Sequence, residues 1–260
     1  MKKVLGALLM LSMAIGGTVV APNTTKDVHA ATTIQSNRWY EGMTDGESDQ
    51  VYTYKMQGSG YFYYQVVPDQ GGYYYDGEYE SSTSYRVSTS MIKNYKFYEK
   101  NEDCYYSEGG FKSGIYGFKP GDNINIKVND APKDKTHYKI KVTFVKVKNF
   151  ERENNNSRSK ANKIKKGITY TGLAMSDNDD WFVFKAPKTK KYKIKVVNTT
   201  KATWWAEAES YLGYTKKDRE TLWGDDGWKT VYSGKIKKGK KVYIKISNWG
   251  STNIYKLRVK

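Results

Sequence analysis

Oxygen-bearing side chains gather at two places in the middle of the chain. The stretch ERENNN, residues 151–156, carries two acids and three amides, and SDNDD, residues 176–180, carries three acids. Ca²⁺ takes six to eight oxygens from carboxylates, amides and backbone carbonyls, at about 2.3 to 2.6 Å. Alternate residues of an extended segment point the same way, so Glu151, Glu153 and Asn155 can face one ion. The alternative is a polar hinge followed by a solvated turn.

Strands must position these side chains, because hydrophobic residues alternate with a period of two along most of the chain. In KKYKIKVVN, residues 190–198, Tyr192 and Ile194 share one face and lysines share the other, as in a half-buried antiparallel strand. The same alternation recurs in residues 240–248 and 254–260. No window of comparable length shows a helical period. The sequence therefore predicts an all-β fold.

The same plan occurs twice in the chain. DQVYTYKMQGSGYFYYQVV, residues 49–67, aligns without a gap on DDWFVFKAPKTKKYKIKVV, residues 179–197, which places Tyr52 on Phe182. Two later blocks align in the same order, residues 118–130 on 236–248 and residues 137–142 on 254–259. Three blocks in one order predict two homologous β-sandwiches with a boundary near Phe150.

The beginning of the chain has the pattern of a secretory signal peptide. Lys2 and Lys3 precede an apolar run from Val4 to Val20, and small residues lead to Ala30. The alternative, a retained membrane anchor, is disfavoured because the run is short and rich in glycine. We therefore expect a signal peptide over 1–30, two tandem antiparallel β-sandwich domains over 31–150 and 151–260, and no integral membrane segment after cleavage.

Charge differs between the two predicted domains. Residues 31–150 hold 15 Lys and Arg against 15 Asp and Glu, whereas residues 151–260 hold 26 against 11, a net charge of +15. A basic surface favours polyanions. Outside the cell an anionic wall polymer or an acidic host glycan suits it better than nucleic acid. The alternative is that lysines at outward positions form a solvated face that protects sheet edges.

Residue types suited to catalysis are scarce. Cys104 is the single cysteine, so no intramolecular disulfide can form, and no sequence feature orients it toward His137 as a nucleophile and base. Glu207 and Glu209 alternate along one predicted strand without an implied cleft, which argues against a glycosidase pair. We expect a binding protein and not an enzyme.

Aromatic side chains are the second kind of candidate binding residue. Tyrosine and tryptophan offer large rigid areas with a polar tip. Those within strands are expected in the sandwich cores, and those in the variable segments at a ligand-binding surface. The ligand-binding candidates are Tyr73, Tyr74, Tyr75, Tyr79, Trp204, Trp205 and Tyr211.

An acidic turn followed by DDWFVFKAP, KYKIKVV, KIKKGKKVYIKI and YKLRV resembles the bacterial pre-peptidase C-terminal domain. This domain is a jelly-roll-like β-sandwich whose relatives include the collagen-binding domains of clostridial collagenases. The resemblance covers nearly all of residues 151–260, and the first copy through its three aligned blocks. It implies that both sandwiches are jelly-roll-like.

The resemblance also implies a Ca²⁺ site. Calcium-binding members of the family carry a linker Glu-x-Glu-x-Asn-Asp before the first strand and a turn Asp-x-x-Asp before the aromatic strand. This chain departs from the pattern at one position, where an asparagine replaces the usual aspartate. The implied ligand residues are Glu151, Glu153, Asn155, Asn156, Asp177 and Asp180.

These features together predict a secreted or non-covalently surface-associated bacterial protein. We expect it to recognise an extracellular polymer, such as a wall or host glycan or a matrix protein. Two alternatives remain open. One is an accessory targeting or inhibitory factor of a secreted peptidase or hydrolase system, and the other is a structural envelope protein.

Overall fold

The structure is a computed structural model of the 260-residue chain. It describes residues 31–44, 48–68, 73–75, 78–80, 86–105, 108–130, 136–176, 178–200, 205–224, 226–248 and 252–260. The predicted signal peptide, residues 1–30, lies outside the described residues. Within the described ranges, no helix is long and apolar enough to cross a membrane.

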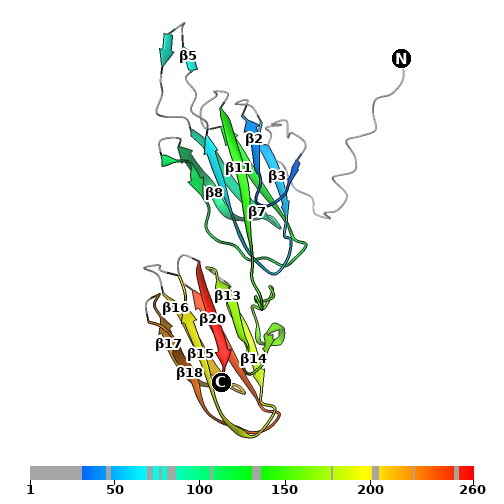
Figure 1. The fold of residues 1–260 in the computed structure, drawn as a ribbon, viewed down its shortest axis with the longest axis vertical. Coiled ribbons are helices and arrows are strands. Elements are labelled where there is room, and N and C mark those ends of the chain that lie inside the picture. Colours follow the sequence, from blue (N-terminus) through cyan, green and yellow to red (C-terminus); the bar gives the residue numbers. More distant parts are fainter. Residues whose placement is uncertain are drawn as a thin grey trace, which may run out of the picture.

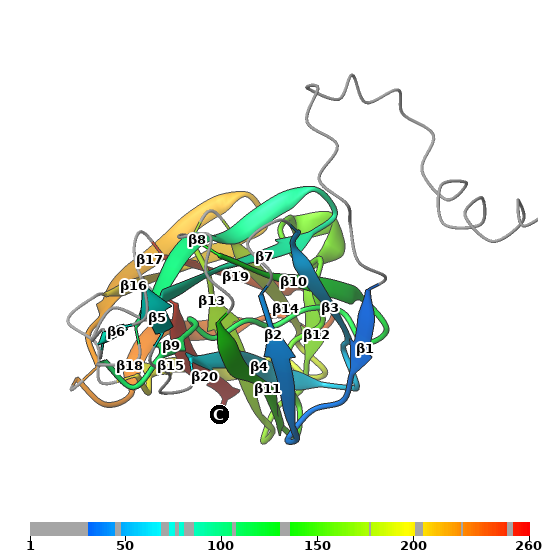
Figure 2. The ribbon, with the colours of Figure 1, turned by 90° about the horizontal axis from the view of Figure 1, so that it is seen from above.

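Two β-sandwiches follow one another along the chain and stack end to end, with the N-terminal one uppermost in Figure 1. Figure 2 looks down on this stack from the N-terminal sandwich. Strands dominate the described residues, and the turn η2 (Arg158–Lys160) is a 3-10 helix of three residues. The predicted all-β sandwich fold is confirmed.

The first sandwich consists of a five-stranded and a four-stranded sheet. In spatial order, the five-stranded sheet contains β1 (Thr32–Ile34), β3 (Gln50–Lys55), β10 (Asn123–Asp130), β7 (Arg86–Lys93) and β8 (Lys96–Tyr105). The facing sheet contains β2 (Trp39–Met43), β11 (His137–Lys146), β4 (Gly60–Pro68) and β9 (Phe111–Lys112). A separate hairpin of β5 (Tyr73–Tyr75) and β6 (Glu78–Glu80) projects from the end away from the second sandwich (Figure 1).

The second sandwich has the same strand order. Its five-stranded sheet contains β12 (Asn162–Ile164), β14 (Asp180–Lys185), β19 (Lys241–Asn248), β16 (Ala206–Leu212) and β17 (Thr215–Leu222). Its four-stranded sheet contains β13 (Thr169–Ala174), β20 (Asn253–Val259), β15 (Lys190–Asn198) and β18 (Lys229–Ile236). In both sandwiches the first strand pairs in parallel, β1 with β3 and β12 with β14.

Alternation along the strands accounts for the two cores. In β4 every second side chain is buried, including Phe62, Tyr64 and Val66, and in β15 Tyr192 and Ile194 are buried between lysines that are exposed or half-buried. Branched and aromatic side chains suit a pleated surface with one buried face. Each sandwich therefore encloses a hydrophobic cluster of its own.

Apolar contacts join the two sandwiches. Leu173 and Met175, from the end of β13 and the residue after it, pack into the hydrophobic cluster of the first sandwich, together with Phe150. The ring of Phe150 lies 6.5 Å from that of Tyr61 between centroids. The linker that follows Phe150 is consequently held between the two sandwiches before it reaches β12.

Candidate metal centre

Three carboxylates meet at the end of the second sandwich that faces the first. Ligand oxygens of Glu151, Glu153 and Asp180 all lie within 4.8 Å of one another. Glu151 is 4% exposed, Asp180 is fully buried and Glu153 is half-buried. Two come from the linker and one opens β14, so the cluster ties the linker to the sheet. Three acids at this distance, two of them buried, repel one another unless protons or a cation neutralise them.

Hydrogen bonds hold two of these carboxylates in place. Glu151 Oε1 accepts a bond from the backbone N–H of Leu173 at 2.6 Å, and Oε2 accepts one from Asn155 Nδ2 at 3.0 Å. The hydroxyl of Tyr255 lies 2.9 Å from Glu151 Oε2 and 2.8 Å from Asp180 Oδ2. A hydroxyl has one proton, so it can donate to only one of these two acids at a time.

Several oxygens in the cluster lack a hydrogen-bond donor. Within the described part of the chain, the buried Oδ1 atoms of Asn155, Asn178 and Asp180 have no partner. Asn178 turns its Nδ2 toward Glu153 Oε1, at 3.5 Å. A buried acceptor without a donor costs about 1 to 3 kcal/mol, and a cation bound among these oxygens would remove that cost.

Burial raises the pKa of all three acids, and repulsion by neighbouring carboxylates adds to the shift at Glu153 and Asp180. Burial raises the pKa of Glu151 to about 7, against the opposing effect of its hydrogen bonds from Leu173 and Tyr255. Burial and then the nearby Glu151 raise the pKa of Glu153 to about 8. Burial, Glu151 and Glu153 raise the pKa of Asp180 well above its usual value. At neutral pH the cluster therefore retains protons that a cation would displace.

The donor set fits a hard divalent cation. It consists of carboxylate and amide oxygens, which Ca²⁺ prefers, and contains no thiolate or imidazole. Glu151, Glu153 and Asp180 would hold the ion, with the amide oxygens of Asn155 and Asn178 beside them. A cation here would fix the linker, since Asn155 also accepts a backbone hydrogen bond from Trp181 at 2.9 Å.

The structure brings together only part of the predicted ligand set. Glu151, Glu153 and Asp180 meet, and Asn155 hydrogen bonds to Glu151. Asn156 is exposed and lines surface cavities, because the residue after the buried Asn155 points the other way along the extended linker. Asp177 lies outside the described residues.

Two residues at the centre were not predicted. Asn178 lies within the predicted acidic turn, and its side-chain amide oxygen could have identified it as a further candidate ligand. Tyr255 comes from β20. The only sequence feature that singles it out is the repeat, which aligns it with Tyr138. Gly172 on β13 faces Tyr255, and a Cβ atom there would overlap the tyrosine hydroxyl. The glycine therefore makes room for the hydroxyl that contacts two acids.

The predicted aromatic ligand-binding residues that the structure describes lie in three places along the chain. Tyr73, Tyr74 and Tyr75 form β5, and Tyr79 of β6 pairs with Tyr74, so this variable segment contains a hairpin. Trp204 lies outside the described residues, and the ring of Trp205 packs 6.3 Å from that of Trp223. Tyr211 lies at the other end of β16 and packs 5.6 Å from Trp181, between centroids.

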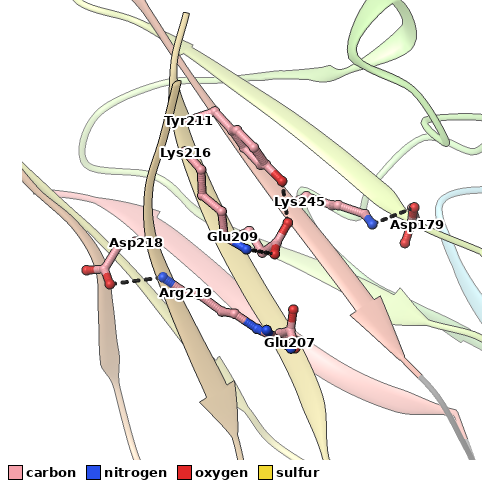
Figure 3. A network of polar contacts seen from close by, with 8 residues as sticks. All are labelled: Asp179, Glu207, Glu209, Tyr211, Lys216, Asp218, Arg219 and Lys245. Carbon is pink, nitrogen blue, oxygen red and sulfur yellow. Dashed lines mark hydrogen bonds and ion pairs between the residues drawn. The ribbon is translucent and has the colours of Figure 1, made fainter. Parts of the chain in front are cut away.

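The residues considered for catalysis have other partners. Cys104 is fully buried, and burial raises the pKa of its thiol. Glu209 forms hydrogen bonds with Lys216 and Tyr211, and Glu207 with Arg219 (Figure 3). Burial raises the pKa of Glu209, but the bonds from Lys216 and Tyr211 outweigh burial, so the pKa lies below its usual value. This carboxylate is held in its charged form on the sheet.

No family model matches the sequence, and neither does any curated protein. Among solved structures, the chain is similar to the M60 catalytic domain with the CBM51-1 and CBM51-2 domains from Clostridium perfringens ZmpB, at 9% identity and a TM-score of 0.29. That similarity covers 82% of this chain and 34% of the other.

Tripeptidyl peptidase 2 matches at 8% identity and a TM-score of 0.31, over 88% of this chain and 24% of its own. The PBSX exported protein XepA matches at 9% identity and a TM-score of 0.22, over 87% and 88%. The chain thus spans about a third and a quarter of the length of the first two proteins. At these scores the likeness carries over neither a fold nor a function from any of them.

Proposed function

We propose that this is an exported, non-catalytic binding protein whose second sandwich recognises an anionic extracellular polymer. A cluster of exposed lysines at the end of that sandwich farthest from the first carries this proposal. We call it the lysine tip, and it comprises Lys166, Lys188, Lys190, Lys237, Lys238 and Lys240.

Three turns and the start of β15 bring the lysine tip together. Lys190 pairs in register with Ile236, and the backbone N–H of Lys238 donates to Thr189 Oγ1 at 2.9 Å. The charge of Lys166 lowers the pKa of Lys190, as expected when ammonium groups crowd together. None of the six lysines pairs with an acid in the described ranges. Such a concentration of one charge attracts polyanions.

The ion of the metal centre is proposed to be Ca²⁺. The resemblance to pre-peptidase C-terminal domains supports this identity, as does the oxygen-only donor set. Because Asn156 replaces an aspartate of the family pattern, we expect weak affinity, with a dissociation constant of about 10⁻⁴ to 10⁻³ M, as in extracellular modules. The role of the ion is structural, since it would fasten the linker to the second sandwich.

The two halves, 31–150 and 151–260, are proposed to be separate folding units. Each has its own pair of sheets and its own hydrophobic cluster. Amide spectra of the two halves expressed separately test this, and dispersed spectra are expected from both. A collapsed, unfolded spectrum from either half would show that the contact through Leu173 and Met175 is indispensable.

Polymer binding is tested by retention of the full chain on immobilised anionic and neutral polymers at increasing ionic strength. We expect retention on the anionic polymers that falls steeply above about 0.15 M salt, where exposed charges are screened beyond about 8 Å. Replacing Lys188, Lys190 and Lys238 by glutamine should abolish most of it, whereas the same change at Lys55, Lys96 and Lys100 of the first sandwich should not. Retention that ignores salt, or an equal effect of both triple variants, would contradict the proposal.

A further inference from the structure

A groove on the outer face of the second sandwich connects the linker to the lysine tip. It encloses about 1350 Å³, and its lining includes Arg158, Trp181, Tyr214, Tyr243 and Lys240. Small-molecule pockets measure about 300 to 1,000 Å³. This groove is larger and lies open along a sheet face, so its size suits a segment of a chain better than a small ligand.

An aromatic cluster surrounds a single guanidinium at the linker end of the groove. Arg158 Cζ lies 5.2 Å from the ring centroid of Trp181, 4.5 Å from that of Tyr211, 5.2 Å from Tyr214 and 5.1 Å from Tyr243. Three of these rings come from the adjacent strands β14, β19 and β16, and Tyr214 lies in the turn between β16 and β17. The rings fix the guanidinium by cation–π contacts.

The fixed guanidinium keeps its donors for a ligand. Arg158 forms no ion pair within the described part of the chain. Arginine presents a planar fork of N–H donors that matches carboxylate or sulfate groups, and a fork held by stacking loses little entropy on binding. Tyr214 is 94% exposed, so a large rigid ring stands beside the fork with one face available.

Positive charge dominates the groove. Its described lining contains five basic side chains, Arg158, Lys235, Lys237, Lys240 and Lys241, and one acid, Asp179. Asp179 is already paired with Lys245 at 2.9 Å (Figure 3). Glu207 and Glu209 on the same face are neutralised by Arg219 and Lys216. The groove therefore offers cations beside aromatic rings, and none of these cations pairs with an acid among the residues that the structure describes.

We propose that this groove binds an anionic polysaccharide, with sugar rings on Tyr214 and Tyr243, an anionic substituent on Arg158, and the chain continuing over Lys240 to the lysine tip. The inference rests on the proposed function and assigns it a site and a ligand class. Charge alone would serve any polyanion, whereas aromatic rings interleaved with cations favour a chain that carries rigid rings with an apolar C–H face next to its charges. An acidic peptide lacks such units at every charge.

Affinity of the full chain for three soluble polymers tests the proposal. Polygalacturonate carries a carboxylate on each sugar, dextran sulfate carries sulfates on sugars, and poly-L-glutamate carries carboxylates without sugars. Comparing the first two polymers shows whether the site prefers carboxylate or sulfate groups. Comparing them with the third shows whether binding needs sugar rings or only charge. We expect both sugar polymers to bind more tightly than polyglutamate at equal charge and salt.

Matched variants locate the site. Arg158→Ala should weaken binding to a sugar polymer about tenfold or more, and Arg158→Lys should not restore it, because lysine lacks the fork. Arg152→Ala removes an exposed charge from the same linker and should change affinity less than about twofold. Tyr214→Ala should weaken sugar binding about two- to tenfold and leave polyglutamate binding unchanged. Tyr95→Asn, which removes an exposed ring from the first sandwich at a left-handed position, is its control.

Melting temperatures of the variants confirm that each is folded. Equal losses of affinity in Arg152→Ala and Arg158→Ala, or tighter binding to polyglutamate than to the sugar polymers, would contradict this inference about the groove and its sugar ligand. Either result would still be consistent with the proposed function of binding an anionic polymer. Binding to sugar polymers that no groove variant weakens would place the site elsewhere. Failure of the unaltered chain to bind any of the three polymers would overturn both this inference and the proposed function.

Discussion

The two sandwiches share one strand order but differ where a buried tyrosine meets a glycine. In the first, Tyr138 of β11 lies opposite Gly42, and its hydroxyl hydrogen bonds to that of Tyr52 at 2.9 Å. In the second, the aligned Tyr255 lies opposite Gly172, and its hydroxyl contacts Glu151 and Asp180. The same position is neutral in one copy and surrounded by acids in the other.

Aligned residues explain the difference. Phe182 replaces Tyr52 and so removes the neutral partner, while Asp180 replaces Gln50 and supplies a carboxylate. Asp49, the last acid of the first turn, is paired with Lys127 at 3.0 Å, and Asp45 and Glu47 lie outside the described residues. In the first copy the buried tyrosine hydroxyl has a neutral hydrogen-bond partner, whereas in the second it contacts carboxylates whose negative charge a cation would balance.

The glycines should show the largest effect. A Cβ atom at Gly172 would overlap the hydroxyl of Tyr255, and one at Gly42 would overlap the hydroxyl of Tyr52. We expect Gly172→Ala and Gly42→Ala each to lower the free energy of unfolding by about 3 kcal/mol, but only Gly172→Ala to weaken stabilisation by calcium as well. Gly58→Ala, where the nearest atom is 3.9 Å away, is the control. Loss of the calcium response in Gly42→Ala would break the comparison.

Dependence on pH comes next. The pKa values of Glu151 and Glu153, about 7 and about 8, lie above the unfolded value of about 4.3. In chelator the folded state therefore holds more protons than the unfolded state, and the raised pKa of Glu151 alone should lower the free energy of unfolding by about 2.5 kcal/mol as the pH rises from 5 to 8. In excess calcium this loss should disappear, because the ion binds more tightly as protons leave. Denaturant titrations at both pH values measure the free energy of unfolding. An increase in this free energy from pH 5 to 8 in chelator would contradict the raised pKa values.

Removing the two aligned tyrosine hydroxyls should lower the free energy of unfolding by smaller amounts, which differ between the two sandwiches. Tyr138→Phe breaks one neutral hydrogen bond and should cost about 1 kcal/mol, whereas Tyr255→Phe removes a donor to carboxylates and should cost about 2 kcal/mol. Tyr214→Phe, at an exposed ring, should change stability by less than about 0.5 kcal/mol. Equal costs at Tyr138 and Tyr255 would mean that the acids do not depend on the tyrosine.

Features that a single segment specifies could be predicted from the sequence, whereas contacts between distant strands could not. Period-two alternation was sufficient for the strands and for placing Glu151 and Glu153 on one side of the linker, whereas their meeting with Asp180 was implied by the resemblance to the pre-peptidase C-terminal domain. Tyr255 was missed because a core tyrosine on a late strand looks the same whether its hydroxyl meets another tyrosine or two acids. The cluster around Arg158 was missed because it needs the register that sets Tyr243 opposite Tyr211, which no single segment specifies.

The central claim is that a cation binds where the second copy has carboxylates and the first does not. It is tested by the melting temperature of the full chain in millimolar calcium and in chelator, for the unaltered protein, Asp180→Asn and Asp49→Asn. In 10 mM calcium, which is about ten- to a hundredfold above the expected dissociation constant, the ion should add about 1.4 to 2.7 kcal/mol, or roughly 3 to 10 °C. This shift should vanish in Asp180→Asn and persist in Asp49→Asn, which loses only the ion pair with Lys127. No shift in the unaltered protein, or the same shift in Asp180→Asn, would contradict the account.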